Sequence, residues 1–198
     1  STSPNLFSEA KISNGMESYL ADILDEKKLN SFMEETQPDI IFHMAAQPLV
    51  RESYKNPKDT FNTNIMGTVN LFESIRKTCT PRAVINVTTD KCYENKEWLW
   101  GYKETDPMGG HDPYSSSKGC SELITNAYRS SYFFNTNTAV ASARAGNVIG
   151  GGDWSDNRLI PDCVKSCSRN KKLLIRNPNS TRPWQHVIEV VFGYIKLI

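Results

Sequence analysis

Tyr114 and Lys118 form the first set of side chains in this sequence whose types and spacing could do chemistry. On a helix, residues four apart lie on the same face, so the phenol and the ammonium would project together. A nearby cation favours the phenolate over the phenol, which makes Tyr114 a candidate general base. By itself the pattern is weak, because an exposed tyrosine and an exposed lysine produce it equally well.

A second polar set, residues 88–91, directly follows an apolar run at residues 83–87 that predicts a buried strand. In an open α/β sheet, ligands bind at the carboxyl ends of the strands. We therefore expect Thr89 and Asp90 to close around one substrate together with Tyr114 and Lys118. The alternative is that these residues only solvate a strand end and cap a turn.

The elements that must position these residues follow an α/β pattern, in which apolar β-rich runs alternate with helical periodicity. Residues 38–44 contain a continuous apolar run, which predicts a buried strand, and residues 83–87 and 138–143 predict two more. Residues 146–153 predict a glycine-rich loop and 173–176 an extended segment. The predicted helices cover residues 25–35, 57–77, 113–132, 159–168 and 186–198. The inner face of the second helix should carry Ile65, Val69, Leu71, Phe72 and Ile75.

The composition is that of an ordinary globular chain of 198 residues. The net charge is only +1, and this small charge argues against a nucleic-acid or membrane-surface partner. No apolar run approaches the roughly 20 residues of a spanning helix. Residues 1–12 are polar and loop-like rather than a leader, and the last helix stops without a cap, so we expect a fragment. The five cysteines include no CxxC pair, which predicts reduced cytosolic thiols and no metal site.

Six motifs occur in one order along nearly the whole chain. They are FHMAAQ (42–47), NxxGTxNLxE (64–73), TTDKCYENKEWLWGY (88–102), DPYSSSKGCSEL (112–123), RAGNVIGGGDW (144–154) and RPWQHV (182–187). Together they resemble the extended short-chain dehydrogenase/reductases, the NAD-dependent epimerase/dehydratase family. The second half of the third motif and GGGDW are the more specific parts, and they are similar to the CDP-glucose 4,6-dehydratase group. Lys91 fits that group, whereas the dTDP-glucose relatives have an acidic residue there.

This resemblance implies a Rossmann-type, doubly wound parallel α/β sheet, incomplete at both ends, with part of a smaller substrate-binding domain. Residues 1–149 would form the NAD-binding domain without its first strand and glycine-rich turn. Residues 150–180 would begin the substrate domain, and residues 181–198 would return to the Rossmann domain.

The activity implied is NAD-dependent 4,6-dehydration of CDP-glucose. Tyr114 would take the proton of the C4 hydroxyl, Thr89 would hydrogen-bond that oxygen, and Asp90 would protonate the departing C6 hydroxyl. Lys91 would stabilise the enolate, while the C5 base stays open between a glutamate and a neutral Lys91. Lys118 would also bind the nicotinamide ribose.

Further contacts are implied by the same resemblance. Asp22 and Ile23 would flank the adenine, and Ala45 and Ala46 would let the backbone approach NAD, although tight strand–helix packing explains the alanines equally well. The GxxGxxG turn typical of NAD sites does not precede Asp22, and the glycines of residues 146–152 have the wrong spacing for it.

For the nucleotide sugar, Asn147 and Arg182 are the best candidates, with a surface ion pair as the alternative for Arg182. Trp154 and Trp184 either line the nucleotide pocket or anchor the core. We expect His43 to be a hydrogen-bonded core histidine and His111 a solvated loop residue.

Two other functions stay open. A nucleotide-sugar epimerase or reductase would need Tyr114 and Lys118 but has no use for Asp90, and a non-catalytic nucleotide-sugar binder would fit the missing glycine turn. The resemblance further implies a cytoplasmic homodimer formed through a four-helix bundle, acting in deoxysugar biosynthesis for O-antigen lipopolysaccharide.

Overall fold

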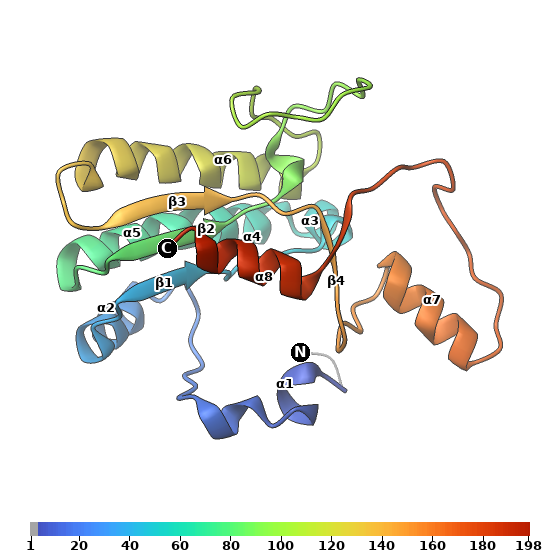
Figure 1. Ribbon diagram of the computed structural model, residues 1–198, viewed down its shortest axis with the longest axis horizontal. Coiled ribbons are helices and arrows are strands. Elements are labelled where there is room, and N and C mark those ends of the chain that lie inside the picture. Colours follow the sequence, from blue (N-terminus) through green and yellow to red (C-terminus); the bar gives the residue numbers. More distant parts are fainter. Residues whose placement is uncertain (1–3) are drawn as a thin grey trace. The chain divides into compact units, whose positions relative to one another are not determined.

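The computed structural model describes residues 4–198, which form two compact units (Figure 1). One unit combines the chain up to Leu20 with Gly146–Val191. The other combines Ala21–Ala145 with Phe192–Ile198 and contains the candidate catalytic residues. No helix among residues 4–198 is both long and apolar enough to cross a membrane.

The larger unit, Ala21–Ala145 with Phe192–Ile198, alternates helices and strands, as the sequence predicts. Its strands are β1 (Ile40–His43), β2 (Ala83–Val87) and β3 (Ala139–Ala143). Its helices are α2 (Glu26–Thr36), α3 (Val50–Lys55), α4 (Pro57–Phe61), α5 (Gly67–Thr78) and α6 (Pro113–Tyr128). The shorter helical turns are η2 (Asn62–Met66), η3 (Asp90–Cys92) and η4 (Arg129–Phe133). The three strands predicted between residues 25 and 143 and the helices predicted at residues 25–35 and 113–132 are therefore confirmed, with small shifts of the ends.

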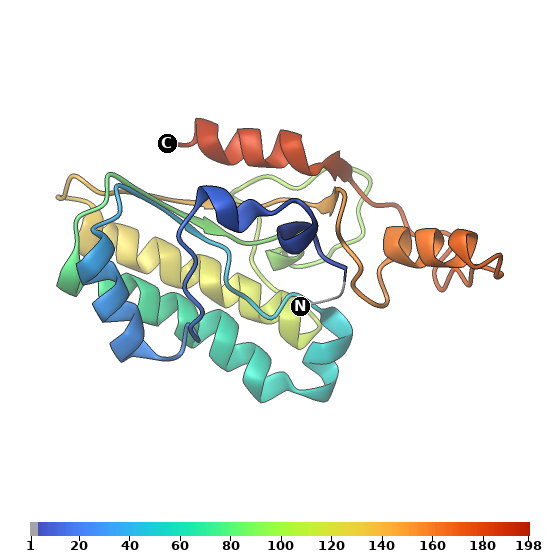
Figure 2. The same ribbon diagram turned by 90° about the horizontal axis from the view of Figure 1, so that it is seen from below.

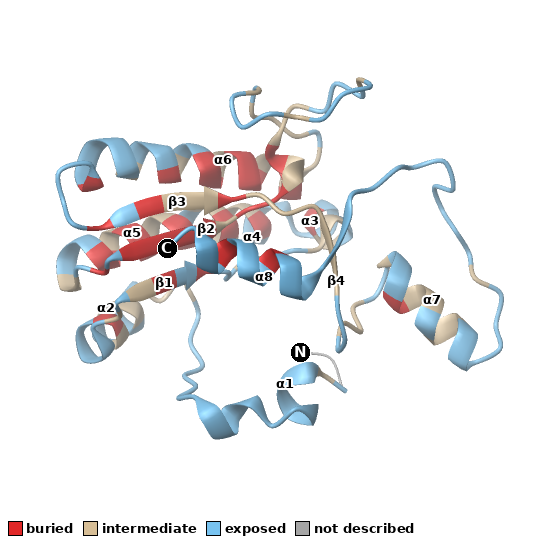
Figure 3. Ribbon diagram, in the orientation of Figure 1, coloured by how far each residue is buried: buried red, intermediate tan, exposed pale blue. Residues whose placement is uncertain are grey.

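The three strands form a parallel sheet in the order β1-β2-β3. Figure 2 shows α5 and α6 side by side along one side of this sheet. Their inner faces and β2 carry most of the buried residues, coloured red in Figure 3. Parallel strands connected by helices are the arrangement that the alternating pattern predicts.

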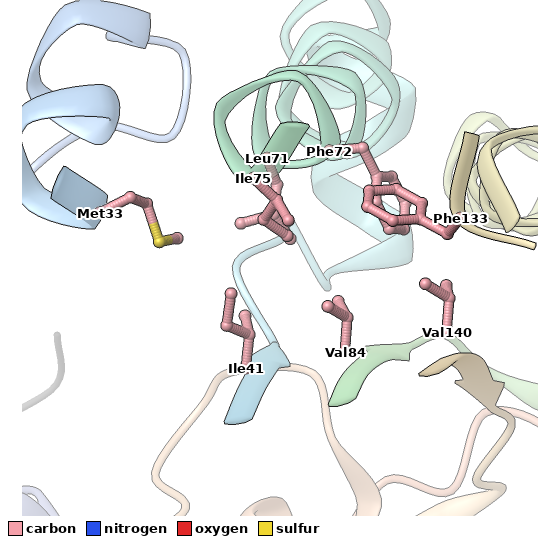
Figure 4. Packing of buried hydrophobic residues seen from close by; sticks show 8 residues of the cluster. All are labelled: Met33, Ile41, Leu71, Phe72, Ile75, Val84, Phe133 and Val140. Carbon is pink, nitrogen blue, oxygen red and sulfur yellow. The ribbon is translucent and has the colours of Figure 1, made fainter. Parts of the chain in front are cut away.

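An apolar core lies between the sheet and these helices (Figure 4). Phe72 and Ile75 of α5 are fully buried and lie over Val84 of β2. The Phe72 ring stacks on Tyr128 at a centroid distance of 5.1 Å. The other buried members of the cluster are Met33, Ile41, Leu71, Phe133 and Val140. Leu71, Phe72 and Ile75 were predicted to lie on the inner face, and the structure confirms them.

The predicted full burial of β1 is wrong. Ile41 is buried, but Phe42 is 38% exposed and Met44 is 55% exposed. Successive side chains of a strand point to opposite faces. The residues on the side of Ile41 pack on the core, whereas the opposite side, which carries Phe42, stays accessible.

The helix predicted at residues 57–77 is also not a regular one. The wide π-helical turn η2 separates α4 from α5, and Ile65 and Val69 are only half-buried. The buried residues of this stretch include four polar ones, Thr60, Asn64, Thr68 and Ser74. A π turn changes the helical phase and often occurs at functional sites, so the apolar periodicity could not predict which residues turn inward here.

The smaller unit consists of the chain up to Leu20 and Gly146–Val191. Its helical segments are α1 (Leu6–Glu9), η1 (Ile12–Gly15) and α7 (Leu159–Ser168). Its strands, β4 (Asn147–Ile149) and β5 (Trp184–His186), pair in parallel. Helix α8 (Val187–Lys196) begins in this unit and ends in the other. The helix at residues 159–168 is confirmed, and the final helix begins one residue later than predicted.

Two predictions fail in the smaller unit. The glycine-rich stretch 146–153 contains strand β4, and the loop predicted at residues 1–12 includes helix α1. Residues 1–3 of that loop lie outside the described chain. Residues 173–176 lie outside the strands, and their extended conformation stays a prediction. β4 was missed because its partner β5 is far away in sequence, and a three-residue strand has no periodicity to reveal it.

Candidate functional site

The end of β2 is held beside the end of β3 by backbone hydrogen bonds. The Thr88 amide donates to the Ala143 carbonyl at 2.8 Å, and the Asp90 amide donates to the Ala145 carbonyl at 3.0 Å. The pairing of the two strands thus continues past their last regular residues. It carries Thr89 and Asp90 to the carboxyl edge of the sheet, where α/β proteins bind ligands.

Thr89, Asp90 and Lys91 form one small polar group there. Thr89 caps the turn η3, and its hydroxyl donates to Asp90 Oδ1 at 3.1 Å. Lys91 Nζ lies 3.4 Å from the same oxygen, and both charged side chains are about one-third exposed, at 33% and 32%. Lys91 is therefore an ion-paired, partly solvated ammonium rather than a deeply buried amine.

Tyr114 and Lys118 lie on the first turns of α6. Asp112 caps this helix by accepting a hydrogen bond from the Ser115 amide, and Pro113 occupies its first turn, which fixes where the helix begins. Tyr114 is 9% exposed and Lys118 is 6% exposed. The predicted helical pair is thus present and faces the protein interior instead of the solvent.

Lys118 links α6 to the strand end. Its ammonium donates to the Val87 carbonyl at 3.1 Å, two residues before Thr89. Burial lowers the pKa of Lys118 to about 8, although the Glu122 carboxylate opposes this shift. Helix α6 also packs on η3, so the structure brings the two predicted catalytic sets, residues 89–91 and the Tyr114–Lys118 pair, to the same edge of the sheet.

The candidate cofactor residues lie in loops of the same unit. Ala45 is exposed and Ala46 half-buried in the irregular segment that follows β1. The exposed Asp22 accepts the Leu24 amide at 2.9 Å, and the half-buried Ile23 packs against Gly67 at the start of α5. A side chain at Gly67 would collide with Ile23, so this glycine allows the close approach.

The candidate substrate residues belong to the smaller unit. Asn147 opens β4, and its amide donates to the Pro183 carbonyl at 2.9 Å. Arg182, which precedes Pro183, is exposed, so the β4–β5 pair brings the two candidates into one neighbourhood. The side-chain oxygen of Asn147 is buried and has no hydrogen-bond partner among the described residues.

The remaining candidate residues are His43, His111 and Trp184, for which the sequence allowed more than one role. His43 is 6% exposed, and its Nε2 lies 3.3 Å from the Thr68 hydroxyl, which confirms a hydrogen-bonded core histidine. Burial, with help from the Lys118 charge, lowers the pKa of His43 to about 4. His111 is exposed, as expected. Trp184 is 41% exposed, which excludes a core anchor within its unit.

Sequence reasoning missed a layer of buried polar side chains between the sheet and the helices. Asn64 of η2 donates to the Ser117 hydroxyl at 2.8 Å and accepts the Gln47 amide at 2.8 Å. Asn86 of β2 donates to Ser121 at 2.9 Å and to Thr125 at 2.7 Å. The serines and threonine of α6 lie four residues apart, at 117, 121 and 125, and this spacing was the available signal.

Glu122 was missed as well. Its carboxylate is buried and accepts hydrogen bonds from Thr88 and, at 2.7 Å, from Ser142. Arg144 Nη2 lies 2.9 Å from the same carboxylate. Burial opposes ionisation of Glu122, but the hydrogen bonds from Arg144, Thr88 and Ser142 outweigh burial and hold the pKa of the carboxyl below its ordinary value. Its spacing of four from Lys118 was visible in the sequence.

The fold and this edge of the sheet define a Rossmann-type α/β protein, and comparisons with known proteins narrow the class. The family model described as GDP-mannose 4,6 dehydratase matches residues 3–198, and the chain belongs to this family. It is 53% identical to CDP-glucose 4,6-dehydratase of Salmonella typhimurium over 98% of this chain and 55% of that protein. The chain therefore spans about half the length of this curated relative.

Solved structures confirm the predicted fold class. A dTDP-glucose 4,6-dehydratase from Streptomyces venezuelae, crystallised with NAD bound, superposes with a TM-score of 0.78. It is 26% identical, and the match covers 88% of this chain and 52% of that one. UDP-glucose 4-epimerase from Thermotoga maritima gives a TM-score of 0.83 at 22% identity, covering 91% and 58% of the two chains.

Proposed function

We propose that the protein containing this chain catalyses the NAD-dependent 4,6-dehydration of CDP-glucose to CDP-4-keto-6-deoxyglucose. The observation that carries this proposal is the 53% identity with a CDP-glucose 4,6-dehydratase over nearly the whole chain. The arrangement of Thr89, Asp90, Tyr114 and Lys118 at one edge of the sheet gives it a chemical basis.

The residues present fit a nicotinamide cofactor. An ammonium group has three hydrogen-bond donors, and Lys118 makes one hydrogen bond to the described residues, to Val87, which leaves donors for ribose hydroxyls. Ala45 and Ala46 would admit the cofactor backbone, and Asp22 and Ile23 would flank its adenine. When bound, the cofactor would accept a hydride from C4 of the sugar and later return one to C6.

In the proposed reaction, Tyr114 accepts the proton of the C4 hydroxyl while Thr89 hydrogen-bonds the same oxygen. The positive charge of Lys118, one turn further along α6, favours the phenolate form of Tyr114. Oxidation at C4 makes the C5 hydrogen acidic, and a base removes it as a proton and leaves an enolate. Because Lys91 is an ion-paired ammonium, we assign this base to a glutamate rather than to Lys91. Lys91 stabilises the negative charge of the enolate, which fits an ammonium already paired with Asp90.

Asp90 then supplies a proton to the C6 hydroxyl, which leaves as water and creates a C5–C6 double bond. Addition of a hydride at C6 and a proton at C5 gives the 4-keto-6-deoxy sugar. Asp90 receives hydrogen bonds from Thr89 and Lys91, so its carboxyl group is held next to the other reacting groups. The protonated carboxyl group of Asp90 is the general acid of this step.

The sugar nucleotide would contact the smaller unit through Asn147 and Arg182. The guanidinium of Arg182 suits a diphosphate, and the buried, unpartnered oxygen of Asn147 suits a hydroxyl donor. We keep the predicted division into a cofactor domain at residues 1–149, the start of a substrate domain at 150–180 and a return segment at 181–198.

We further propose that the protein is a cytoplasmic homodimer that pairs its α5 and α6 helices into a four-helix bundle and serves deoxysugar synthesis for O-antigen. Leu123 of α6 is 60% exposed and Met66, just before α5, is 45% exposed. Exposed apolar side chains on α6 and on η2, the turn that leads into α5, would suit such an interface.

A nucleotide-sugar epimerase is the alternative, because a UDP-glucose 4-epimerase of Mycoplasma genitalium is 34% identical over 77% of this chain. An epimerase retains every carbon–oxygen bond of the sugar and needs no acid for C6. Asp90 beside Thr89 therefore favours dehydration.

The test uses the full-length gene product with NAD⁺ and, in separate reactions, CDP-, dTDP- and UDP-glucose. The alkali-induced absorbance of a 4-keto-6-deoxy sugar is measured for the wild type, Asp90→Asn and Asp25→Asn. The last variant makes the same charge change at the N-cap of α2. A signal with CDP-glucose that Asp90→Asn alone abolishes supports the proposal. A signal with another nucleotide overturns the CDP assignment, and no signal from folded protein with NAD bound overturns dehydration.

A further inference from the structure

Two residues of α6 hold two consecutive residues at the end of β2. Lys118 donates to the Val87 carbonyl at 3.1 Å, and the Thr88 hydroxyl donates to the Glu122 carboxylate one helical turn later. Thr89 and Asp90 follow directly along the chain. The two contacts therefore set the register between α6, which carries Tyr114, and the strand end that carries the proposed acid.

The second oxygen of Glu122 extends this connection to β3 and to the loop after β2. It accepts the Ser142 hydroxyl at 2.7 Å and Arg144 Nη2 at 2.9 Å. Arg144 Nη1 in turn donates to the Tyr93 hydroxyl at 2.9 Å and to the Glu104 carbonyl at 3.1 Å. The side chains of Glu122 and Arg144 are only 5% and 16% exposed. Water therefore does little to weaken this ion pair.

Glu122 also influences the charge of Lys118. Burial disfavours the ammonium form of Lys118, and the Glu122 carboxylate is the group that counteracts burial. Other ionisable residues on the elements around Lys118 include His43 on β1, Tyr114 and Cys120 on α6, and Asp90, Lys91 and Cys92 on η3. His43 is buried and has a pKa of about 4, so it is neutral near pH 7 and adds no charge.

From this geometry we infer that Glu122 is a positioning residue for the proposed reaction. It aligns Thr89 and Asp90 with Tyr114 and keeps Lys118 charged, without touching the substrate. This inference rests on the proposed function, but its structural part can be tested without any turnover.

The first test measures kcat, KM and the pH dependence of kcat for the full-length enzyme and four variants. In Glu122→Gln the carboxamide keeps the shape and loses the charge, and Glu122→Asp keeps the charge. Thr88→Val removes the strand contact without leaving a buried charge unpaired. Glu73→Gln is the matched control, because Glu73 also binds a tyrosine and an arginine, Tyr128 and Arg76, but away from the strand end.

We expect kcat to fall about 10- to 100-fold in Glu122→Gln and Thr88→Val, because a shift of about 1 Å at a reacting group has effects of this size. Loss of the Glu122 charge lets Lys118 lose its proton at lower pH. The alkaline limb of the kcat–pH profile should therefore shift to lower pH by about one unit in Glu122→Gln. In Glu122→Asp, this limb should return to nearly its wild-type position. A purely structural role would reduce the folded fraction and leave the limb in place, which would overturn the inference.

The second test is amide hydrogen exchange of the same proteins without substrate. In Glu122→Gln and Thr88→Val, exchange should accelerate in peptides that contain the Thr88 and Asp90 amides. Peptides that contain the Arg82 and Ala139 amides, at the other end of the same strands, should keep their protection. If the wild type performs no dehydration but these local changes occur, the proposed function fails and the positioning role of Glu122 remains. Unchanged exchange at Thr88 and Asp90 would overturn the inference even in an active enzyme.

Discussion

The two halves of the layer between the sheet and the α5–α6 pair differ in chemistry. Near the start of the strands, Ile41, Val84 and Val140 are paired across the sheet and form a row that packs against Phe72 and Ile75. Two residues later, the next inward row consists of His43, Asn86 and Ser142, again paired across the three strands. One row is apolar and the other polar, although both lie on the same face of one sheet.

The helices repeat this division. Polar residues of α5 and α6, such as Thr68 and Ser121, meet the polar row, and their hydroxyls lie 3.0 Å apart. Apolar burial stabilises in proportion to area and has no direction, whereas hydrogen bonds fix distances and angles. The apolar row therefore stabilises the fold, whereas the polar row aligns the edge of the sheet that carries the candidate site.

The largest expected effect is on the apolar row. Phe72→Ala should lower the free energy of unfolding by about 3–5 kcal/mol, because it removes a fully buried ring and leaves a cavity. Urea denaturation measures this loss. At urea concentrations below the unfolding midpoint, the turnover per folded molecule of the variant should equal that of the wild type. A large drop in that turnover would contradict the separation of the two rows.

The polar row should make stability depend on pH through His43. Its pKa is lowered from 6.5 to about 4 in the native state, so the unfolded chain binds this proton first. The contribution is fully present above pH 6.5 and is lost as pH falls towards 4, with a size of about 3 kcal/mol. His43→Gln, which cannot titrate, should have a flatter stability profile than the wild type in urea titrations between pH 7 and 4.5. Parallel profiles would contradict the account.

A smaller loss of stability is expected at Asn86. Asn86→Ala removes the hydrogen bonds to Ser121 and Thr125 and should cost about 2 kcal/mol. Unlike Phe72→Ala, it should also reduce kcat of the folded enzyme, because Asn86 lies in the polar row two residues before Thr88. Thermal unfolding and steady-state kinetics of the same preparation check both parts. Unchanged kcat would show that the polar row does not align the site.

The smallest effect should occur outside both rows. Lys77 forms an ion pair with Glu26 at 2.8 Å, but the two side chains are about half exposed, at 50% and 46%. Exposed ion pairs contribute little, because water and salt screen them. Lys77→Met should leave both the unfolding midpoint and kcat unchanged within error. A clear decrease in either quantity would mean that residues outside the two rows also contribute to stability or to turnover.

Much of this architecture could be predicted from the sequence. The apolar run at residues 83–87 predicted β2, and the spacing of Tyr114 and Lys118 predicted a common helix face. The polar row could not be predicted, because Asn86 sits inside an apolar run and its partners are more than 30 residues away. Glu122 was missed because its partners Thr88, Ser142 and Arg144 come together only when α6 packs on the sheet.

The dehydration itself is the central claim, and solvent deuterium tests it most directly. The full-length protein is incubated with CDP-glucose and NAD⁺ in D₂O, returned to ordinary water, and the sugar nucleotide is analysed by mass spectrometry. Because elimination removes the C5 hydrogen and a solvent proton replaces it, the product should have lost one water and gained one deuterium at C5. An isomer of CDP-glucose with unchanged mass and no deuterium would contradict the account and support epimerisation.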